Sequence, residues 1–178
     1  DVVCLTEVRS QHLLHFKQGF PHMFDACKYE WTRWSKIPGL RKNRIAVLSK
    51  DFIHAEKQFF KTGMKRVFLT FRSIWGEGHF VHLSLGKRTR NNQISDLRKR
   101  IHDRAFFVGD FNTLSKTEQG VCPIYQNKVH NILSFPSIGT KRTLDHCIGT
   151  VCQDITYFDS EISDHLGMIF QIGAPRLA

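Results

Sequence analysis

The residues best suited to chemistry in this sequence are polar side chains beside apolar segments. They are Glu7, Asp110, Asn112, Asp145, Asp164 and His165. Carboxylates next to core segments need partners, because burying an unpaired charge is costly, and we expect no buried Lys or Arg within these motifs to compensate them. Since converging carboxylates repel one another, a bound cation is the simplest compensation. Oxygen ligands without a thiolate cluster favour Mg²⁺ or Mn²⁺ over zinc.

The tetrapeptide from Gly109 to Asn112 has a local geometry that suits a reaction centre. Gly109 allows a sharp turn after an apolar segment. In extended geometry Asp110 and Asn112 point to the same side, because side chains alternate with period two. An acid and an amide aimed at one point suit a water or a metal beside a phosphate oxygen. A plain Gly/Asp/Asn turn is the alternative.

The second polar motif is Ser163-Asp164-His165. A histidine accepts protons near neutral pH, and a carboxylate partner fixes its tautomer, for which Asp145 is the candidate. The alternative is an Asp-His pair on a surface loop. A serine-hydrolase triad through Ser163 is disfavoured, since the sequence has no G-x-S-x-G elbow.

Cysteine usage indicates neither a disulfide framework nor a clear zinc site. The chain has five cysteines, an odd number without tight spacing. A zinc site would need Cys122, His146, Cys147 and Cys152, but no C-x-x-C pair is present. A reducing compartment is the default, and with no visible signal peptide the expected location is cytoplasmic.

The elements that must position these residues alternate between strands and helices. Apolar runs and period-two alternation predict strands, and a stripe with Ile94, Leu97 and Ile101 predicts an amphipathic helix. The expected strands cover 2–5, 45–49, 66–74, 79–85, 105–108, 143–148 and 166–170, and the expected helices cover 9–20 and 90–101. Buried strands joined by helices imply a layered α/β architecture with covered sheets.

Charge indicates the kind of partner. The 178 residues suffice for one domain and carry a formal net charge of +10, which favours nucleic acid, an anionic membrane or a phosphorylated small molecule. Basic stretches and tryptophans for base stacking are available. These are Arg41, Lys42, Arg44, Lys87, Arg88, Arg90, Trp31, Trp34 and Trp75. No apolar run approaches the roughly 18–20 residues of a membrane span.

The order of the motifs resembles the endonuclease/exonuclease/phosphatase superfamily, which includes DNase I-like nucleases, sphingomyelinases and inositol-phosphate phosphatases. Residues 1–8 are similar to its "DvvxLQEv" segment, with Thr6 where Gln is usual. Residues 45–50 and 81–83 look like its "xaiLSr" and "xHL" elements. Residues 109–112 match "GDFN", 144–146 match "(I/L)D(Y/H)", and 163–165 match "SDH". The resemblance runs from Asp1 to about Gln171.

This resemblance implies a DNase I-like fold, an α/β (α+β) four-layer sandwich of two packed mixed β-sheets flanked by helices. Residues 1–178 would form one domain. The family usually begins with an Asn-bearing strand, and this chain starts after it, at the segment leading to Glu7, so we expect the N-terminal strand to be missing.

The resemblance also implies site roles. Glu7 and Asp164 would bind Mg²⁺ or Mn²⁺, Asp110 would position or deprotonate the attacking water, and His165, oriented by Asp145, would stabilise the developing charge. The residues expected to contact substrate are Asn112, His82 and Arg90.

The implied activity is Mg²⁺-dependent hydrolysis of a phosphoester by in-line attack of water on phosphorus, with a phosphodiesterase or nuclease acting on DNA or RNA as the first expectation. One alternative is a sphingomyelinase-like enzyme for lipid or sugar phosphates, which would use the same cations on an anionic lipid surface. Another is a nucleic-acid-binding module with impaired catalysis.

Overall fold

The structure is a computed structural model that describes residues 1–74, 76–113, 144–149, 151–158, 165 and 167–173. The strands are β1 (Val2–Arg9), β2 (His22–Cys27), β3 (Asn43–Ser49), β4 (His54–Phe59), β5 (Val67–Ser73), β6 (Gly76–His82), β7 (Ala105–Asp110), β8 (Asp145–Ile148), β9 (Cys152–Phe158) and β10 (Gly167–Ile172). The helices are α1 (Ser10–Leu13), α2 (Pro38–Arg41) and α3 (Lys87–Arg98), with 3₁₀ turns η1 (Leu14–Phe16) and η2 (Arg33–Lys36). None of the helices found in these ranges has the length and apolar character of a membrane span.

The strands of the described residues form three sheets. One is antiparallel with the order β1-β3-β2, and a small one pairs β10 with β9. The largest sheet has the order β4-β5-β6-β7-β8 and is mixed, because β6 and β7 run parallel while the other neighbours run antiparallel. The parallel pair brings the carboxyl ends of β6 and β7 to one edge.

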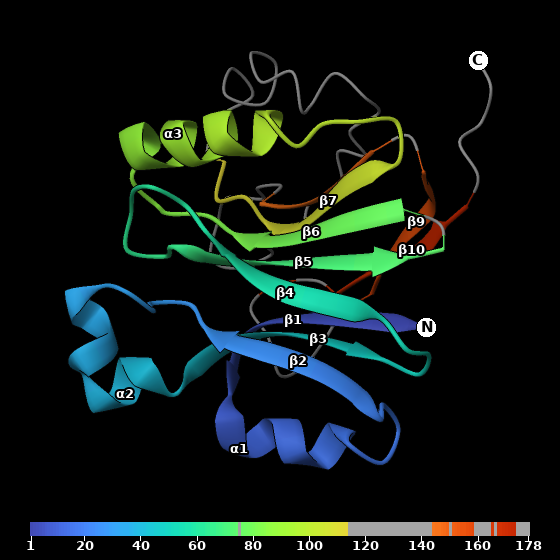
Figure 1. Cartoon of the computed structure of the whole chain (residues 1–178), viewed down its shortest axis with the longest axis horizontal. Coiled ribbons are helices and arrows are strands. Elements are labelled where there is room, and N and C mark those ends of the chain that lie inside the picture. Colours follow the sequence, from blue (N-terminus) through green and yellow to red (C-terminus); the bar gives the residue numbers. More distant parts are fainter. Residues whose placement is uncertain (75, 114–143, 150, 159–164, 166, 174–178) are drawn as a thin grey trace.

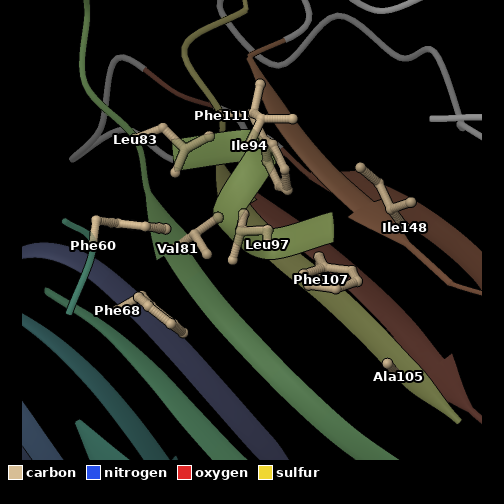
Figure 2. Packing of buried hydrophobic residues seen from close by; sticks show 10 residues of the cluster. All are labelled: Phe60, Phe68, Val81, Leu83, Ile94, Leu97, Ala105, Phe107, Phe111 and Ile148. Atoms are coloured by element: carbon tan, nitrogen blue, oxygen red, sulfur yellow. The ribbon is translucent and has the colours of Figure 1, made fainter. Parts of the chain in front are cut away.

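The five-stranded sheet is buried on both faces, which explains why its central strands are apolar without alternation. One face, with Val81 and Phe107, packs on Ile94 and Leu97 of α3 (Figure 2). The opposite face packs on the three-stranded sheet in a second cluster. That cluster includes Ile45, Val47, Val67, Leu69, Phe71, Phe80, Phe106 and Val108.

The layers therefore stack as helix, sheet, sheet and helix. In Figure 1, α3 covers the outer side of the five-stranded sheet, α1 lies on the outer side of the three-stranded sheet, and α2 lies beyond the end of β2. Side chains of β10, including Met168, Phe170 and Ile172, pack against the core between the sheets. The predicted α/β sandwich with packed sheets is confirmed. Of the two packed sheets, the five-stranded one is mixed, as expected, and the three-stranded one is antiparallel.

Several predicted elements differ in extent from the observed ones. The helix expected over 90–101 spans Lys87–Arg98, so Ile101 lies beyond it and is 42% exposed. The helix expected over 9–20 stops after one turn at Leu13, continues as a 3₁₀ turn, and leaves Leu14 61% exposed. The strands β2, β4 and β9 were not predicted, and each lies at an edge of its sheet.

Candidate active site

Three predicted site residues lie in one row at the edge of the five-stranded sheet. His82 ends β6, Asp110 ends β7 and Asp145 begins β8. Because β6 and β7 are parallel, His82 and Asp110 are register partners, and because β7 and β8 are antiparallel, Asp110 and Asp145 are partners too. Strand direction alone thus brings side chains from distant parts of the sequence together.

Gly109 makes the approach of β7 to β6 possible. Its φ is +128°, a region that L side chains rarely adopt, and a Cβ there would lie 2.1 Å from the carbonyl oxygen of Val81. The glycine therefore acts inside the strand pair, one residue before Asp110, rather than only in a turn that follows the strand.

Asp110 and Asn112 meet, but not through the extended geometry that we expected. Asn112 has φ of 51°, in the left-handed region, and folds its side chain back. Its backbone N–H donates to Asp110 Oδ1 at 2.8 Å, and its Nδ2 donates to Asp110 Oδ2 at 2.9 Å and to the Leu83 carbonyl at 3.0 Å. A side-chain amide has two N–H bonds, so both are engaged within the protein.

One nitrogen of the His82 ring contacts both a carboxylate and an ammonium group. Its Nε2 is 3.2 Å from Asp110 Oδ2 and also contacts Lys65 Nζ. Burial lowers the pKa of His82, and although Asp110 opposes that effect the net direction is down. Burial raises the pKa of Asp110, but the hydrogen bond and charge of His82 and the charge of Lys65 outweigh it and lower the pKa. The pair therefore favours an ionised Asp110 beside a neutral imidazole.

Glu7 is presented by a bulge in β1. It has φ of 56°, and the pairing of β1 with β3 shifts register between Leu5 and Val8. Its side chain is 56% exposed, and Oε1 accepts a hydrogen bond from Lys28 Nζ. Partial burial raises the pKa of Glu7, but Lys28 outweighs that effect and lowers the pKa.

Two lysines, Lys28 and Lys65, are site residues that the sequence analysis missed. Lys28 follows β2 and is only 1% exposed, and Lys65 precedes β5. Burial lowers the pKa of Lys65 to about 8, with Asp110 opposing that shift. Lysines from outside the motifs therefore also compensate these carboxylates, in addition to the bound cation that the sequence analysis expects. A lysine next to strand residues carries no sequence signal for such a role.

Asp145 and His165 form the contact that the sequence predicted. Asp145 Oδ2 lies 2.5 Å from His165 Nδ1, and the two side chains are 15% and 27% exposed. This contact fixes which ring nitrogen faces the carboxylate and turns Nε2 away from it.

Arg90, expected to bind substrate, is instead packed into the loop between β6 and α3. It is 1% exposed, and its Nη1 donates to the carbonyl oxygens of Ser84 and Leu85. Its contacts are those of a side chain that holds this loop. Asp164, the other expected metal ligand, lies outside the described residues.

The alternative zinc site gains no support from the described residues. Cys147 and Cys152 are adjacent, with Sγ atoms 2.6 Å apart, but His146 Nε2 lies 3.1 Å from Thr113 Oγ1. Cys122 falls outside the described ranges. Within those ranges no group of three or more His, Cys, Asp and Glu side chains is arranged to hold a metal ion.

A magnesium ion nevertheless fits the chemistry of Glu7. Mg²⁺ binds through one or two carboxylates and completes its coordination with water and substrate phosphate. Glu7 is a half-exposed carboxylate, and its Oε1 lies 3.9 Å from Nε2 of His82. We call the sheet edge with His82 and Asp110, together with the adjacent Glu7, the catalytic rim. Lys28 on the buried side of Glu7 is the group with which a cation must compete.

Comparison with solved structures identifies the fold. An endonuclease domain of TRAS1, a telomere-specific non-LTR retrotransposon, is 16% identical with a TM-score of 0.64, over 98% of this chain and 86% of that chain. The 3′ phosphatase NExo from Neisseria, bound to a product DNA hairpin, is 12% identical with a TM-score of 0.63, over 97% and 89%. The human Nocturnin catalytic domain is 15% identical with a TM-score of 0.63, over 96% and 81%.

No protein-family model matches the chain, and no curated protein matches it. The structural likeness shows the fold, which is DNase I-like and of the endonuclease/exonuclease/phosphatase type.

Proposed function

We propose that this protein is a Mg²⁺-dependent phosphoester hydrolase that cleaves phosphodiester bonds of nucleic acid by in-line attack of water on phosphorus. The observation that carries the proposal is the row His82–Asp110–Asp145 at one sheet edge, extended by Asn112 on Asp110 and by His165 on Asp145. The solved structures with this fold include an endonuclease and a 3′ phosphatase bound to product DNA.

In this mechanism Asp110 accepts a proton from the attacking water. Its lowered pKa keeps the carboxylate ionised at neutral pH. Asn112 is a positioning residue, because both of its amide N–H bonds hold Asp110 and the Leu83 carbonyl. In this proposal, positioning of Asp110 replaces the role of phosphate ligand that the family resemblance implies for Asn112. His82 Nε2 contacts the same carboxylate oxygen, Asp110 Oδ2, at 3.2 Å.

His165 stabilises the negative charge that develops on the phosphate. Asp145 holds its Nδ1, which turns the opposite edge of the ring, with Nε2, away from the carboxylate and leaves it to face substrate. Glu7 and Asp164 would hold the divalent cation, which would screen phosphate charge and stabilise the leaving oxygen.

A nucleic-acid substrate is supported by basic residues that extend beyond a single phosphate. A surface hollow is lined by Ser10, Lys36, Pro38, Lys42 and Arg44. One of its lining residues, Arg44, is the register partner of Val8, the residue after Glu7, and its Nε pairs with Asp25 Oδ2 at 2.5 Å. A chain of phosphates occupies such an extended basic path better than one headgroup does.

Trp31 follows the site residue Lys28 by three positions in the sequence, and it is 75% exposed. Its ring packs edge-on with Phe59 at 5.9 Å, and its carbonyl oxygen accepts a hydrogen bond from Arg66 Nη1 at 3.5 Å. Exposed and anchored, this indole offers a face on which a nucleobase stacks.

The test is a substrate panel with the purified protein in Mg²⁺ or in excess EDTA. We expect cleavage of labelled DNA or RNA oligonucleotides that needs the metal and disappears in the Asp110→Asn variant. Sphingomyelin or phosphoinositide vesicles and free nucleotides serve as competing substrates. Turnover of the lipids without turnover of any oligonucleotide would move the proposal to a lipid phosphodiesterase, and full activity in EDTA would remove the metal from it.

A further inference from the structure

Lys28 carries a buried positive charge in the middle of the candidate active site. Its side chain is 1% exposed, whereas its partner Glu7 is 56% exposed. A buried ammonium group needs an anionic partner, because leaving it unpaired is strongly destabilising. The Tyr29 ring, with its centroid 5.0 Å from Lys28 Nζ, adds a weaker attraction.

The backbone of Lys28 is fixed, so only its side chain is able to change partner. The Lys28 carbonyl accepts a hydrogen bond from the Arg66 N–H at 3.2 Å, and the Lys28 N–H donates to the Asn43 carbonyl at 3.4 Å. The first bond ties the segment after β2 to the segment before β5 that carries Lys65. Both ammonium groups are therefore held on the rim by the same pair of segments.

A divalent cation and Lys28 cannot both use Glu7 at full strength. A bound cation would have to use the solvent-exposed part of the Glu7 carboxylate, because Lys28 contacts Oε1 and is itself buried. Two positive groups on one carboxylate repel each other, and the repulsion is strong where water is excluded. Binding of the cation alone therefore weakens the ion pair on which Lys28 depends.

We propose that Lys28 couples metal binding to phosphate binding: it neutralises Glu7 in the metal-free protein and transfers its hydrogen bond to a phosphate oxygen when a divalent cation takes Glu7. This inference rests on the proposed function and assigns to Lys28 a contact with the substrate. The phosphate restores the anionic partner that the buried ammonium has lost, so metal and phosphate each favour the binding of the other.

Linkage makes this coupling measurable at equilibrium, without turnover. If phosphate raises the affinity for Mg²⁺ by some factor, Mg²⁺ raises the affinity for phosphate by the same factor, which for coupled sites is typically about 5–150-fold. Replacing Lys28 with the uncharged Met removes the competitor for Glu7. The variant should bind Mg²⁺ more tightly in the absence of phosphate and should respond less to added phosphate.

The experiment is calorimetric titration of Mg²⁺ into the wild type and Lys28→Met, each with and without inorganic phosphate. In the wild type we expect phosphate to tighten Mg²⁺ binding at least about fivefold, and in Lys28→Met by less than about twofold. Lys28→Gln should behave as Lys28→Met does, and it serves if Met disturbs folding. The matched control is Lys57→Met, which removes an exposed lysine paired with Glu30 at 2.7 Å and should leave both affinities unchanged.

The outcomes separate this inference from the proposed function. Equal phosphate coupling in the wild type and Lys28→Met overturns the role of Lys28 and leaves the metal-dependent hydrolase intact. The same conclusion follows if Lys28→Met binds Mg²⁺ alone no more tightly than the wild type does. If neither protein binds Mg²⁺ with or without phosphate, the metal dependence in the proposed function fails together with this inference.

Discussion

Asp110 and Asp145 face each other as register partners on β7 and β8, yet each carboxylate has its own histidine. Asp110 Oδ2 lies 3.2 Å from Nε2 of His82, and Asp145 Oδ2 lies 2.5 Å from Nδ1 of His165. The first pair is more than nine-tenths buried and carries Asn112 as well, whereas the second is partly exposed. Neighbouring acids thus sit in different environments, which suits different roles in one reaction.

The first prediction is that Asp145 and His165 act as a unit. His165→Ala should lower kcat/KM for an oligonucleotide by roughly 10²–10⁴-fold, the range of a positioned acid–base group. Adding Asp145→Asn should lower it little further, because effects within one catalytic unit are not additive. Steady-state kinetics of both single variants and the double variant measure this. His54→Ala, at an exposed histidine of β4, is the control, and losses that multiply would show that Asp145 does not act through His165.

The second prediction concerns the basic hollow and the salt dependence of binding. If its lysines contact backbone phosphates, the log–log slope of affinity against salt is about −0.9 per phosphate on duplex DNA and about −0.7 on single strands. Lys36→Ala with Lys42→Ala should flatten the slope by about one to two such contacts. Hydrolysis of a small chromogenic phosphodiester should stay nearly unchanged, because the hollow does not touch the reacting phosphorus.

The measurement is titration of a labelled oligonucleotide at several salt concentrations, with Ca²⁺ replacing Mg²⁺ to slow cleavage. The control variant, Lys50→Ala with Lys99→Ala, removes the same charge from lysines paired with Asp1 and Asp96 elsewhere on the molecule. An equal change of slope in both variants would mean that net charge alone, and not the hollow, sets the affinity. Arg90 is unsuitable for this test because it is buried and holds the loop before α3.

How far the sequence predicts this structure depends on burial. Strands whose two faces are covered, such as β3 and β7, appear as apolar runs and were predicted within two residues. The edge strands β1, β8 and β10 contain apolar residues in a row or in alternation and were predicted. The edge strands β2, β4 and β9 were missed, because they carry charges such as Asp25 or Lys57, which an edge position tolerates, in place of an apolar pattern. Their pairing is a tertiary property without a strong local pattern.

The same limit applies to the candidate site. Asp110, Asn112 and Asp145 were found because each lies in a short motif at the end of an apolar strand. Lys28 and Lys65 were missed, because their partners, Glu7 and His82, lie 21 and 17 residues away in the chain. The left-handed backbone of Asn112 was missed as well, since alternation along a strand assumes an extended chain.

The third prediction is that Gly109→Ala destabilises the fold. A side chain at φ of +128° is strained, and its Cβ would clash with the backbone carbonyl of Val81. We expect the free energy of unfolding to fall by at least about 2 kcal/mol, measured by urea denaturation. Gly39→Ala is the control, because a Cβ there meets nothing within 4 Å and alanine favours the helix. Equal stabilities of the two variants would contradict the prediction.

The last prediction uses His79, a histidine in the core beneath the site rather than in it. Its ring is fully buried, stacks on Phe107 at 4.9 Å, and its Nδ1 lies 3.0 Å from Thr70 Oγ1. Burial lowers the pKa of His79 from 6.5 to about 4. The nearby carboxylate of Glu77 opposes the shift, and Arg100, His102 and Arg72 add to it.

Because the folded pKa of His79 is lowered, the unfolded chain binds more protons between pH 6.5 and about 4. The stability contributed by His79 is complete above pH 6.5 and is lost as the pH falls through this window. The loss is on the order of 3 kcal/mol at about 1.4 kcal/mol per pKa unit. Urea unfolding at pH 7, 6 and 5 should therefore show a steeper decline for the wild type than for His79→Gln, whatever the variant's stability at neutral pH, while His54→Gln should decline as the wild type does. Parallel curves for wild type and His79→Gln would show that acid destabilisation arises elsewhere.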